Sequence, residues 1–175
     1  AKRCGEAICH SFNQSNTNNC KAVAARVALS YGPGTRPNDD RAINQFIRHA
    51  LLNREIRLQD AGNAVRTYCY VSDCVEMLLN IWLHGKQAEV YNVGGFSRLT
   101  ILDLAEMIGA YCDVPVLAPT PMVVNDTSAP KVVSMSINRY LEEFIDGARN
   151  LHVPMDEGLA RTIDWQAEHP EWMSN

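Results

Sequence analysis

The chain has 175 residues, 46% of them hydrophobic and 21% charged, and a formal net charge of −4. This balance is ordinary for a globular domain and argues against a nucleic-acid-binding surface, which needs a basic face. No run approaches the roughly 18 apolar residues of a membrane span, and no secretory signal is visible. We therefore expect a cytoplasmic protein without nucleic-acid or membrane partners.

The six cysteines show neither a Cys-x-x-Cys pair nor a histidine at zinc-ligand spacing. Cysteine and histidine ligands of zinc normally recur at short, regular spacings, so we predict no metal site. Four of the cysteines fall in apolar patterns, and we expect buried free thiols.

The first third of the sequence predicts a helix, a strand and a second helix. Residues 1–14 carry apolar residues at helical spacing. Residues 20–34 are mostly apolar and end in Gly-Pro-Gly, which predicts a buried parallel strand. Within 35–54, Asn38 or Asp39 is a candidate cap for a helix. Its expected apolar side consists of Ile43, Phe46, Ile47, Ala50 and Leu51.

The middle of the chain predicts two strands and another helix. Residues 55–62 and 65–71 are short alternating stretches around an Ala-Gly-Asn turn. Ser72 or Asp73 is the candidate cap of the following helix. The residues expected to share its apolar face are Val75, Leu78, Leu79 and Trp82.

The remaining elements favour an α/β protein. Residues 89–95 read as a strand, and Thr100 with Asp103 resembles a capping box that opens a helix over 100–112. The last third predicts strands within 114–119 and 131–137 and helices within 138–148 and 156–169. Alternating strands and helices indicate an α/β fold with a smaller mixed part toward the C-terminus.

Four stretches in order match one family pattern. They are AKR..GE at the start, R...SYGPG over 26–34, VRTYCYVSD over 65–73, and YNVGG....TILDLAEMIG over 91–109. This ordered set resembles the C-terminal half of the NAD-dependent epimerase/dehydratase family, which belongs to the extended short-chain dehydrogenases/reductases. The resemblance covers roughly residues 1–166 and is nearest to the dehydratases and UDP-glucuronate decarboxylases.

The resemblance implies the C-terminal part of a Rossmann-like doubly wound fold plus a small mixed α/β substrate-binding domain. Residues 1–36 would be the residual Rossmann part, and 37–175 would mainly bind a nucleotide sugar, with about 65–95 returning to the Rossmann sheet. The family forms dimers through a bundle that includes the first helix. We therefore expect a homodimer with residues 1–14 as candidate interface.

The resemblance also implies that the cofactor is NAD. Lys2 falls at the lysine of the family's Tyr-x-x-x-Lys motif, where the ammonium lowers the pKa of a phenol one helical turn away. Lys2 is thus the candidate catalytic residue, and Lys2, Tyr31 and Pro33 are candidate cofactor contacts. The sequence contains no Gly-rich dinucleotide fingerprint. We therefore expect a fragment whose NAD is bound mainly by a preceding part, and which is inactive alone.

The substrate contacts implied by the resemblance centre on Arg66, which would bind the nucleotide diphosphate through its forked guanidinium. Ser30 stands where the family usually has Asn. The other candidate substrate residues are Arg57, Gln59, Asn92 and Lys131.

The implied activity is an NAD-dependent conversion of a nucleotide-diphosphate sugar. Oxidation at C4 would give a 4-keto intermediate, from which dehydration, decarboxylation or epimerisation becomes feasible. A 4-epimerase parent remains an alternative, as does a non-catalytic nucleotide-sugar-binding module.

Overall fold

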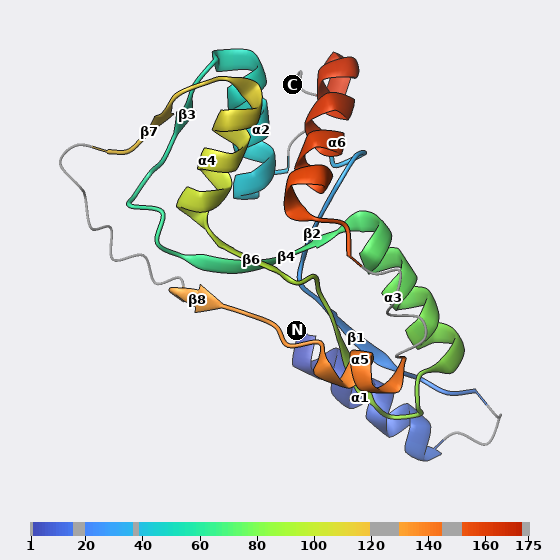
Figure 1. Ribbon diagram of the computed structural model, residues 1–175. Coiled ribbons are helices and arrows are strands. Elements are labelled where there is room, and N and C mark those ends of the chain that lie inside the picture. The colour runs from blue at the N-terminus through green and yellow to red at the C-terminus, as the bar shows by residue number, and fades with distance from the viewer. Residues whose placement is uncertain (1, 16–19, 37–38, 120–129, 145–151, 173–175) are drawn as a thin grey trace.

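Short strands alternate with helices along the chain, as the sequence predicts (Figure 1). The computed structural model describes residues 2–15, 20–36, 39–119, 130–144 and 152–172. The helices are α1 (Lys2–Ser15), α2 (Ala42–Asn53), α3 (Val71–His84), α4 (Ile101–Cys112), α5 (Asn138–Glu143), α6 (Met155–Glu168) and the 3-10 helix η2 (Pro170–Trp172). The strands are β1 (Ala24–Val27), β2 (Leu29–Tyr31), β3 (Ile56–Arg57), β4 (Val65–Tyr70), β5 (Val90–Val93), β6 (Ser97–Thr100), β7 (Val116–Leu117) and β8 (Val132–Val133).

Strand β4 pairs with three other strands. It runs parallel to β2, with Leu29 opposite Tyr68, and parallel to β8 at its beginning, with Arg66 opposite Val133. On its other side it runs antiparallel to β6. Parallel and antiparallel pairings thus meet on one strand, and β2, β6 and β8 are all positioned by β4.

The stretch predicted as one buried strand forms two strands with different partners. β1 pairs in parallel with β5, whereas β2 pairs with β4, and the switch falls at Ala28. The prediction of burial is wrong for β1, where Val27 is 46% exposed. The apolar composition reflects strand propensity here, and β1 has a paired neighbour only in β5 among the described strands.

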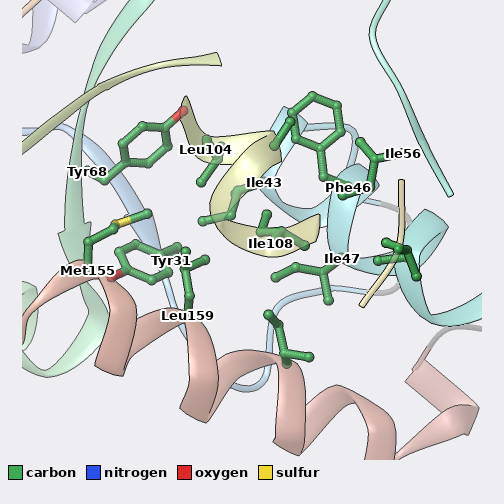
Figure 2. Close-up of a cluster of buried hydrophobic side chains, with 14 of the residues drawn as sticks. Tyr31, Ile43, Phe46, Ile47, Ile56, Tyr68, Leu104, Ile108, Met155 and Leu159 are labelled. Carbon is green, nitrogen blue, oxygen red and sulfur yellow. The ribbon is translucent and has the colours of Figure 1, made fainter. Parts of the chain in front are cut away.

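A large hydrophobic cluster lies where α2, α4 and α6 cover β2 and β4 (Figures 1 and 2). The apolar side predicted for α2 is confirmed, because Ile43, Phe46, Ile47 and Ala50 are buried, with Leu51 packed against them. Figure 2 shows the rings of Tyr31 and Tyr68 beside Met155 of α6. The two rings meet edge to face, with centroids 6.4 Å apart.

The predicted helix starts are right for α4 and wrong for α2 and α3. At α4, Thr100 and Asp103 exchange both hydrogen bonds of a capping box. The residues preceding α2 and α3 are Arg41 and Tyr70, and neither makes a side-chain capping bond. Asp73 instead accepts a hydrogen bond from the backbone N–H of Val153 at 3.1 Å. Asn38, the other candidate cap of α2, lies outside the described residues.

The apolar face predicted for α3 is exposed. Val75, Leu78, Leu79 and Trp82 are between 36% and 73% exposed. The buried side of α3 consists of Asp73, Cys74, Met77 and Ile81. The last three of these belong to a second cluster that includes Tyr91 and Tyr140. Helix α3 is apolar on more than one side, so periodicity alone could not tell which side the rest of the chain covers.

One further prediction is confirmed and one is corrected. The two strands predicted around the Ala-Gly-Asn turn are present as β3 and β4, and β3 pairs in parallel with β7. Of the six cysteines, only Cys69 and Cys74 are buried, whereas Cys4 and Cys20 are exposed. Among the described helices, none has the length and apolar character that crossing a membrane requires.

The close approach of α6 to the sheet gives a prediction for Gly158. A Cβ at this position would lie 2.3 Å from the Tyr31 hydroxyl oxygen and 2.9 Å from a ring carbon of Tyr70. Overpacking of this kind costs about 1–3 kcal/mol, so Gly158→Ala should lower the free energy of unfolding in urea titrations. The matched control is Gly5→Ala in α1, where nothing lies within 4 Å. Alanine has a higher helix propensity than glycine, so Gly5→Ala should raise the free energy of unfolding by up to about 1 kcal/mol. Equal stability of the two variants would contradict the packing described.

Candidate functional site

A cavity of about 230 Å³ lies over β2 and β4, beside the first turns of α2 and α4. Its lining residues are Leu29, Ser30, Arg41, Ala42, Ile43, Arg66, Tyr68 and Ile101. The residues Ala42 and Ile101 are the first residues of their helices. Helix N-termini present unpaired backbone N–H groups and a partial positive charge. Arg41, the residue before α2, makes no side-chain cap, and its own backbone N–H donates to the Asp39 carboxylate at 3.0 Å.

The cavity brings together Ser30 and Arg66, two of the residues that the resemblance assigns to the substrate. Ser30 lies on β2 and Arg66 on the neighbouring β4. On β4, Arg66 and Tyr68 are two residues apart, and alternate residues of a strand project from the same face. Ser30 lies opposite Cys69 in the pairing of β2 with β4, so its side chain projects from the other face of the sheet, and its backbone carbonyl is the group that accepts a hydrogen bond from Arg41.

Arg66 is half-buried and held by backbone carbonyls. Its Nη1 donates to the carbonyl oxygens of Val65 at 2.8 Å and Pro130 at 3.1 Å. A guanidinium carries five N–H donors, so these two bonds leave donors for another acceptor. No carboxylate of the described residues forms an ion pair with Arg66. Arg66 is thus oriented but keeps its charge for a ligand.

Arg41 is a lining residue that the sequence analysis missed. Its Nε and Nη2 donate to the Asp39 carboxylate at 2.5–3.0 Å, and its Nη1 donates to the Ser30 carbonyl at 2.7 Å. This guanidinium holds the pKa of Asp39 well below its usual range, chiefly through the side-chain hydrogen bonds. Arg41 therefore ties the start of α2 to β2. The available signal was a basic residue directly before the apolar periodicity of a helix.

Tyr68 reaches the same cavity from β4. The residue is 2% exposed, and its hydroxyl is buried without a hydrogen-bond partner among the described residues. Burial raises the pKa of Tyr68 to about 12, although the charge of Arg66 opposes this shift. The phenol is therefore neutral near pH 7 and cannot serve as a base there.

The three candidate cofactor residues lie outside this cavity. Lys2 is exposed at the first residue of α1. Tyr31 is 3% exposed at the end of β2, inside the large hydrophobic cluster, and burial raises its pKa well above the usual range. Pro33 is half-buried in the turn that follows β2.

The other candidate substrate residues are also apart from the cavity lining. Arg57, on β3, is exposed and pairs with Glu55 at 2.6 Å, and Gln59 is exposed just after that strand. Asn92, on β5, donates from its side chain to the carbonyl of Ser136 at 2.7 Å. Lys131 is exposed next to Pro130, whose carbonyl accepts a bond from Arg66. Of these four residues, Lys131 is thus the one that directly follows a residue hydrogen-bonded to Arg66.

The cavity has the chemistry of a candidate anion-binding site. Two arginines, Arg41 and Arg66, are among its lining residues, and none of the lining residues is acidic. Forked guanidinium donors match the oxygens of phosphate groups. The described lining contains no carboxylate or histidine for proton abstraction, so this arrangement is suited to binding a ligand and not to acid–base chemistry.

Comparisons with known proteins show which family this chain resembles. A family model described as the NAD dependent epimerase/dehydratase family matches residues 1–94. UDP-glucuronic acid decarboxylase 6 of Arabidopsis thaliana is 31% identical over 107 residues, which cover 61% of this chain and 30% of the relative. A dTDP-glucose 4,6-dehydratase of Streptomyces niveus is 26% identical over 175 residues, covering 98% of this chain and 49% of the relative. The chain therefore spans half or less of the length of these curated relatives.

Solved structures of other proteins share this fold. The crystal structure of UDP-glucose 4-epimerase from Thermotoga maritima with UDP-glucose matches 96% of this chain and 52% of its own, with a TM-score of 0.78 and 22% identity. This likeness concerns the fold, and it confirms the α/β, Rossmann-like class implied by the resemblance. Because the family model matches more than half of its residues, the chain belongs to the NAD-dependent epimerase/dehydratase family.

Proposed function

We propose that this chain holds the nucleotide sugar in an NAD-dependent epimerase, dehydratase or decarboxylase that acts through a 4-keto sugar intermediate. The observation that carries the proposal is the cavity that joins Arg66, Arg41 and Ser30 at the N-terminus of α2. Its donors and positive charge suit a diphosphate. Binding energy from a diphosphate, remote from the reacting sugar carbon, orients the sugar for reaction.

The relatives leave the outcome of the reaction open. Their names include a decarboxylase, a dehydratase and a 4-epimerase. All three names contain a sugar or sugar acid linked to a nucleoside diphosphate. A diphosphate site is compatible with each outcome, so we propose the substrate class without choosing the sugar or the base.

The described residues do not fit the pyrophosphate of NAD. A dinucleotide site needs a Gly-rich strand-to-helix turn whose backbone can approach the ligand. β4 passes directly into α3 at Tyr70 and Val71 without a glycine. Gly32, after β2, is close to a side chain, because a Cβ there would lie 2.5 Å from Cγ1 of Val71. We therefore derive no hydride-transfer step from the residues of this chain.

Removing the charge of Arg66 tests the diphosphate site. Arg66→Gln should weaken binding of UDP and dTDP by about 10- to 100-fold, because a charge-assisted hydrogen bond contributes about 1.5–3 kcal/mol. Isothermal titration calorimetry measures the change. The matched control is Arg26→Gln, which removes an equal charge from an exposed ion pair with Glu6. If both variants bound UDP and dTDP with the affinity of the unmodified chain, Arg66 would not be part of the binding site.

The second candidate function is a binding module without catalysis, which the poor fit to NAD favours. This reading predicts that the 175-residue chain forms no product from UDP-glucuronate, dTDP-glucose or UDP-glucose when NAD is supplied. Chromatography of the nucleotide sugars after incubation is the measurement. NAD-dependent product formation by the purified chain would establish catalysis and contradict the module.

Helix α1 supports the proposed homodimer. It has no buried residue, and Ile8 and Phe12, one turn apart, are 67% and 46% exposed. The ion pair between Glu6 and Arg26 ties α1 to β1. An apolar face that the described residues leave uncovered is suited to a second copy of the same helix.

Light scattering during size-exclusion chromatography tests the dimer. Phe12→Ser should lower the dimer fraction at micromolar concentration, because it removes apolar surface from the interface. Leu52→Ser is the control, since Leu52 is 55% exposed at the end of α2 and outside the proposed interface. A monomeric unmodified chain, or an equal loss of dimer in both variants, would contradict an interface through α1.

A further inference from the structure

Two buried cysteines lie together where β4 passes into α3. Cys69 is next to the end of β4, and Cys74 is in the first turn of α3, which follows β4 without an intervening loop (Figure 1). Both residues are buried and belong to the second hydrophobic cluster. Their side chains are hydrogen-bonded to each other. The junction of strand and helix therefore brings two thiol groups into contact.

Ser30 joins the two thiols from the neighbouring strand. It lies opposite Cys69 in the pairing of β2 with β4, so both side chains project from the same face of the sheet. The Ser30 hydroxyl donates a hydrogen bond to the sulfur of Cys74. Arg66 and Tyr68 project from the opposite face of β4. This thiol cluster, made of Cys69, Cys74 and Ser30, thus lies outside the proposed diphosphate site.

The two thiols of the cluster differ in acidity and in exposure. The hydrogen bond from Cys69 lowers the pKa of Cys74, helped by the Ser30 hydroxyl, although burial and the charge of Asp73 oppose the shift. The same bond, together with burial, raises the pKa of Cys69 well above its usual range. Cys74 is 6% exposed, whereas Cys69 is fully buried. Cys74 is therefore the thiolate that a small reagent meets first, and Cys69 keeps its proton.

We propose that Cys69 and Cys74 are a peroxide-sensitive dithiol that closes to a disulfide. This inference goes beyond the proposed function and does not depend on it. A hydroperoxide is suited as the oxidant, because hydrogen peroxide is small enough for a thiol with little exposed surface. A low-pKa thiolate beside a second cysteine is the arrangement in which such oxidation is reversible.

The reaction has two steps. The Cys74 thiolate attacks one oxygen of hydrogen peroxide, the O–O bond breaks, and hydroxide leaves, which gives a sulfenic acid at Cys74. The sulfur of Cys69 then attacks the sulfur of Cys74, so that the S–S bond forms and the S–O bond breaks. The second hydroxide leaves with the Cys69 proton as water, and the first takes up the proton that Cys74 had released. Two thiols are oxidised by two electrons, and one peroxide is reduced to two molecules of water.

Peptide mapping after treatment with hydrogen peroxide tests the proposal on the unmodified chain. Trypsin cleaves after Arg66 and Lys86, so residues 67–86 form one peptide that contains both cysteines. After alkylation of free thiols, mass spectrometry should find this peptide unalkylated and lighter by two hydrogen atoms. The disulfide should form about tenfold faster in the folded chain than in urea, because lowering the pKa by one unit raises the thiolate fraction about tenfold. Equal rates in the folded and unfolded chain, or no disulfide within 67–86, would overturn the proposal.

Cys4 and Cys9 are the matched control pair. They are also five residues apart and are more exposed than Cys69 and Cys74. Both lie within α1, where five residues turn the helix by roughly 140°, so their thiols point to different sides. Peroxide should therefore form no disulfide between Cys4 and Cys9 of the folded chain. A disulfide between them at the rate of the Cys69–Cys74 pair would show that spacing alone decides the reaction, and would contradict the proposal.

Two variants test the order of the steps. Cys69→Ser keeps a hydroxyl donor for Cys74 but cannot form the disulfide, so dimedone should trap a sulfenic acid at Cys74 after peroxide treatment. Cys74→Ser should leave Cys69 unlabelled, because the remaining thiol is protonated and fully buried. Circular dichroism verifies that both variants are folded. Labelling of Cys69 in Cys74→Ser, or none of Cys74 in folded Cys69→Ser, would contradict Cys74 as the attacking group.

Discussion

The pairing of β4 with β2, β6 and β8 is the constraint on which the rest of the structure depends. It sets Ser30 of β2 next to the strand that carries Arg66 and Tyr68. At its end, β4 passes directly into α3, and its buried residues join both hydrophobic clusters. A single strand therefore connects the core, the cavity and the helix that leaves its apolar side exposed.

The charge of the cavity depends on arginines at the start of α2 and on β4. The first turns of α2 and α4 close it, and Arg41 fastens the start of α2 to β2 through the Ser30 carbonyl. The Asp39 carboxylate orients Arg41 and offsets part of its charge. Arg66 is held by carbonyl groups and has no such offset among the described residues. Arg66 is therefore the cation without a carboxylate partner among the described lining residues, and we propose it as the main anchor for an anion.

Elements that depend on neighbouring residues could be predicted from the sequence, whereas features that depend on distant segments could not. Helix α2 and the capping box of α4 were predictable, because both depend on residues close together in the chain. The division of the first strand at Ala28 was not, since it depends on β4 and β5, which come much later. The exposed side of α3 escaped prediction for the same reason, because periodicity identifies apolar sides without identifying what covers them.

The site shows the same division. Ser30 and Arg66 were reached through an ordered motif, and the structure places both at one cavity. Arg41 was missed because its position before a helix is only a weak local signal, and its contact with the Ser30 carbonyl forms only in the folded chain. Tyr68 was visible only as part of a strand, and its orphaned hydroxyl is a property of packing. Side chains whose role comes from long-range burial thus require the folded structure.

The central claim is that a diphosphate occupies the cavity at the start of α2. The most direct measurement is a titration of the ¹⁵N-labelled chain with UDP, followed by two-dimensional NMR, with uridine as the reference ligand. The account predicts that UDP, unlike uridine, shifts the backbone amides of Ser30, Ala42 and Ile43 and the side-chain Nε–H of Arg66. Shifts with UDP that avoid these groups, or that uridine reproduces, would contradict it.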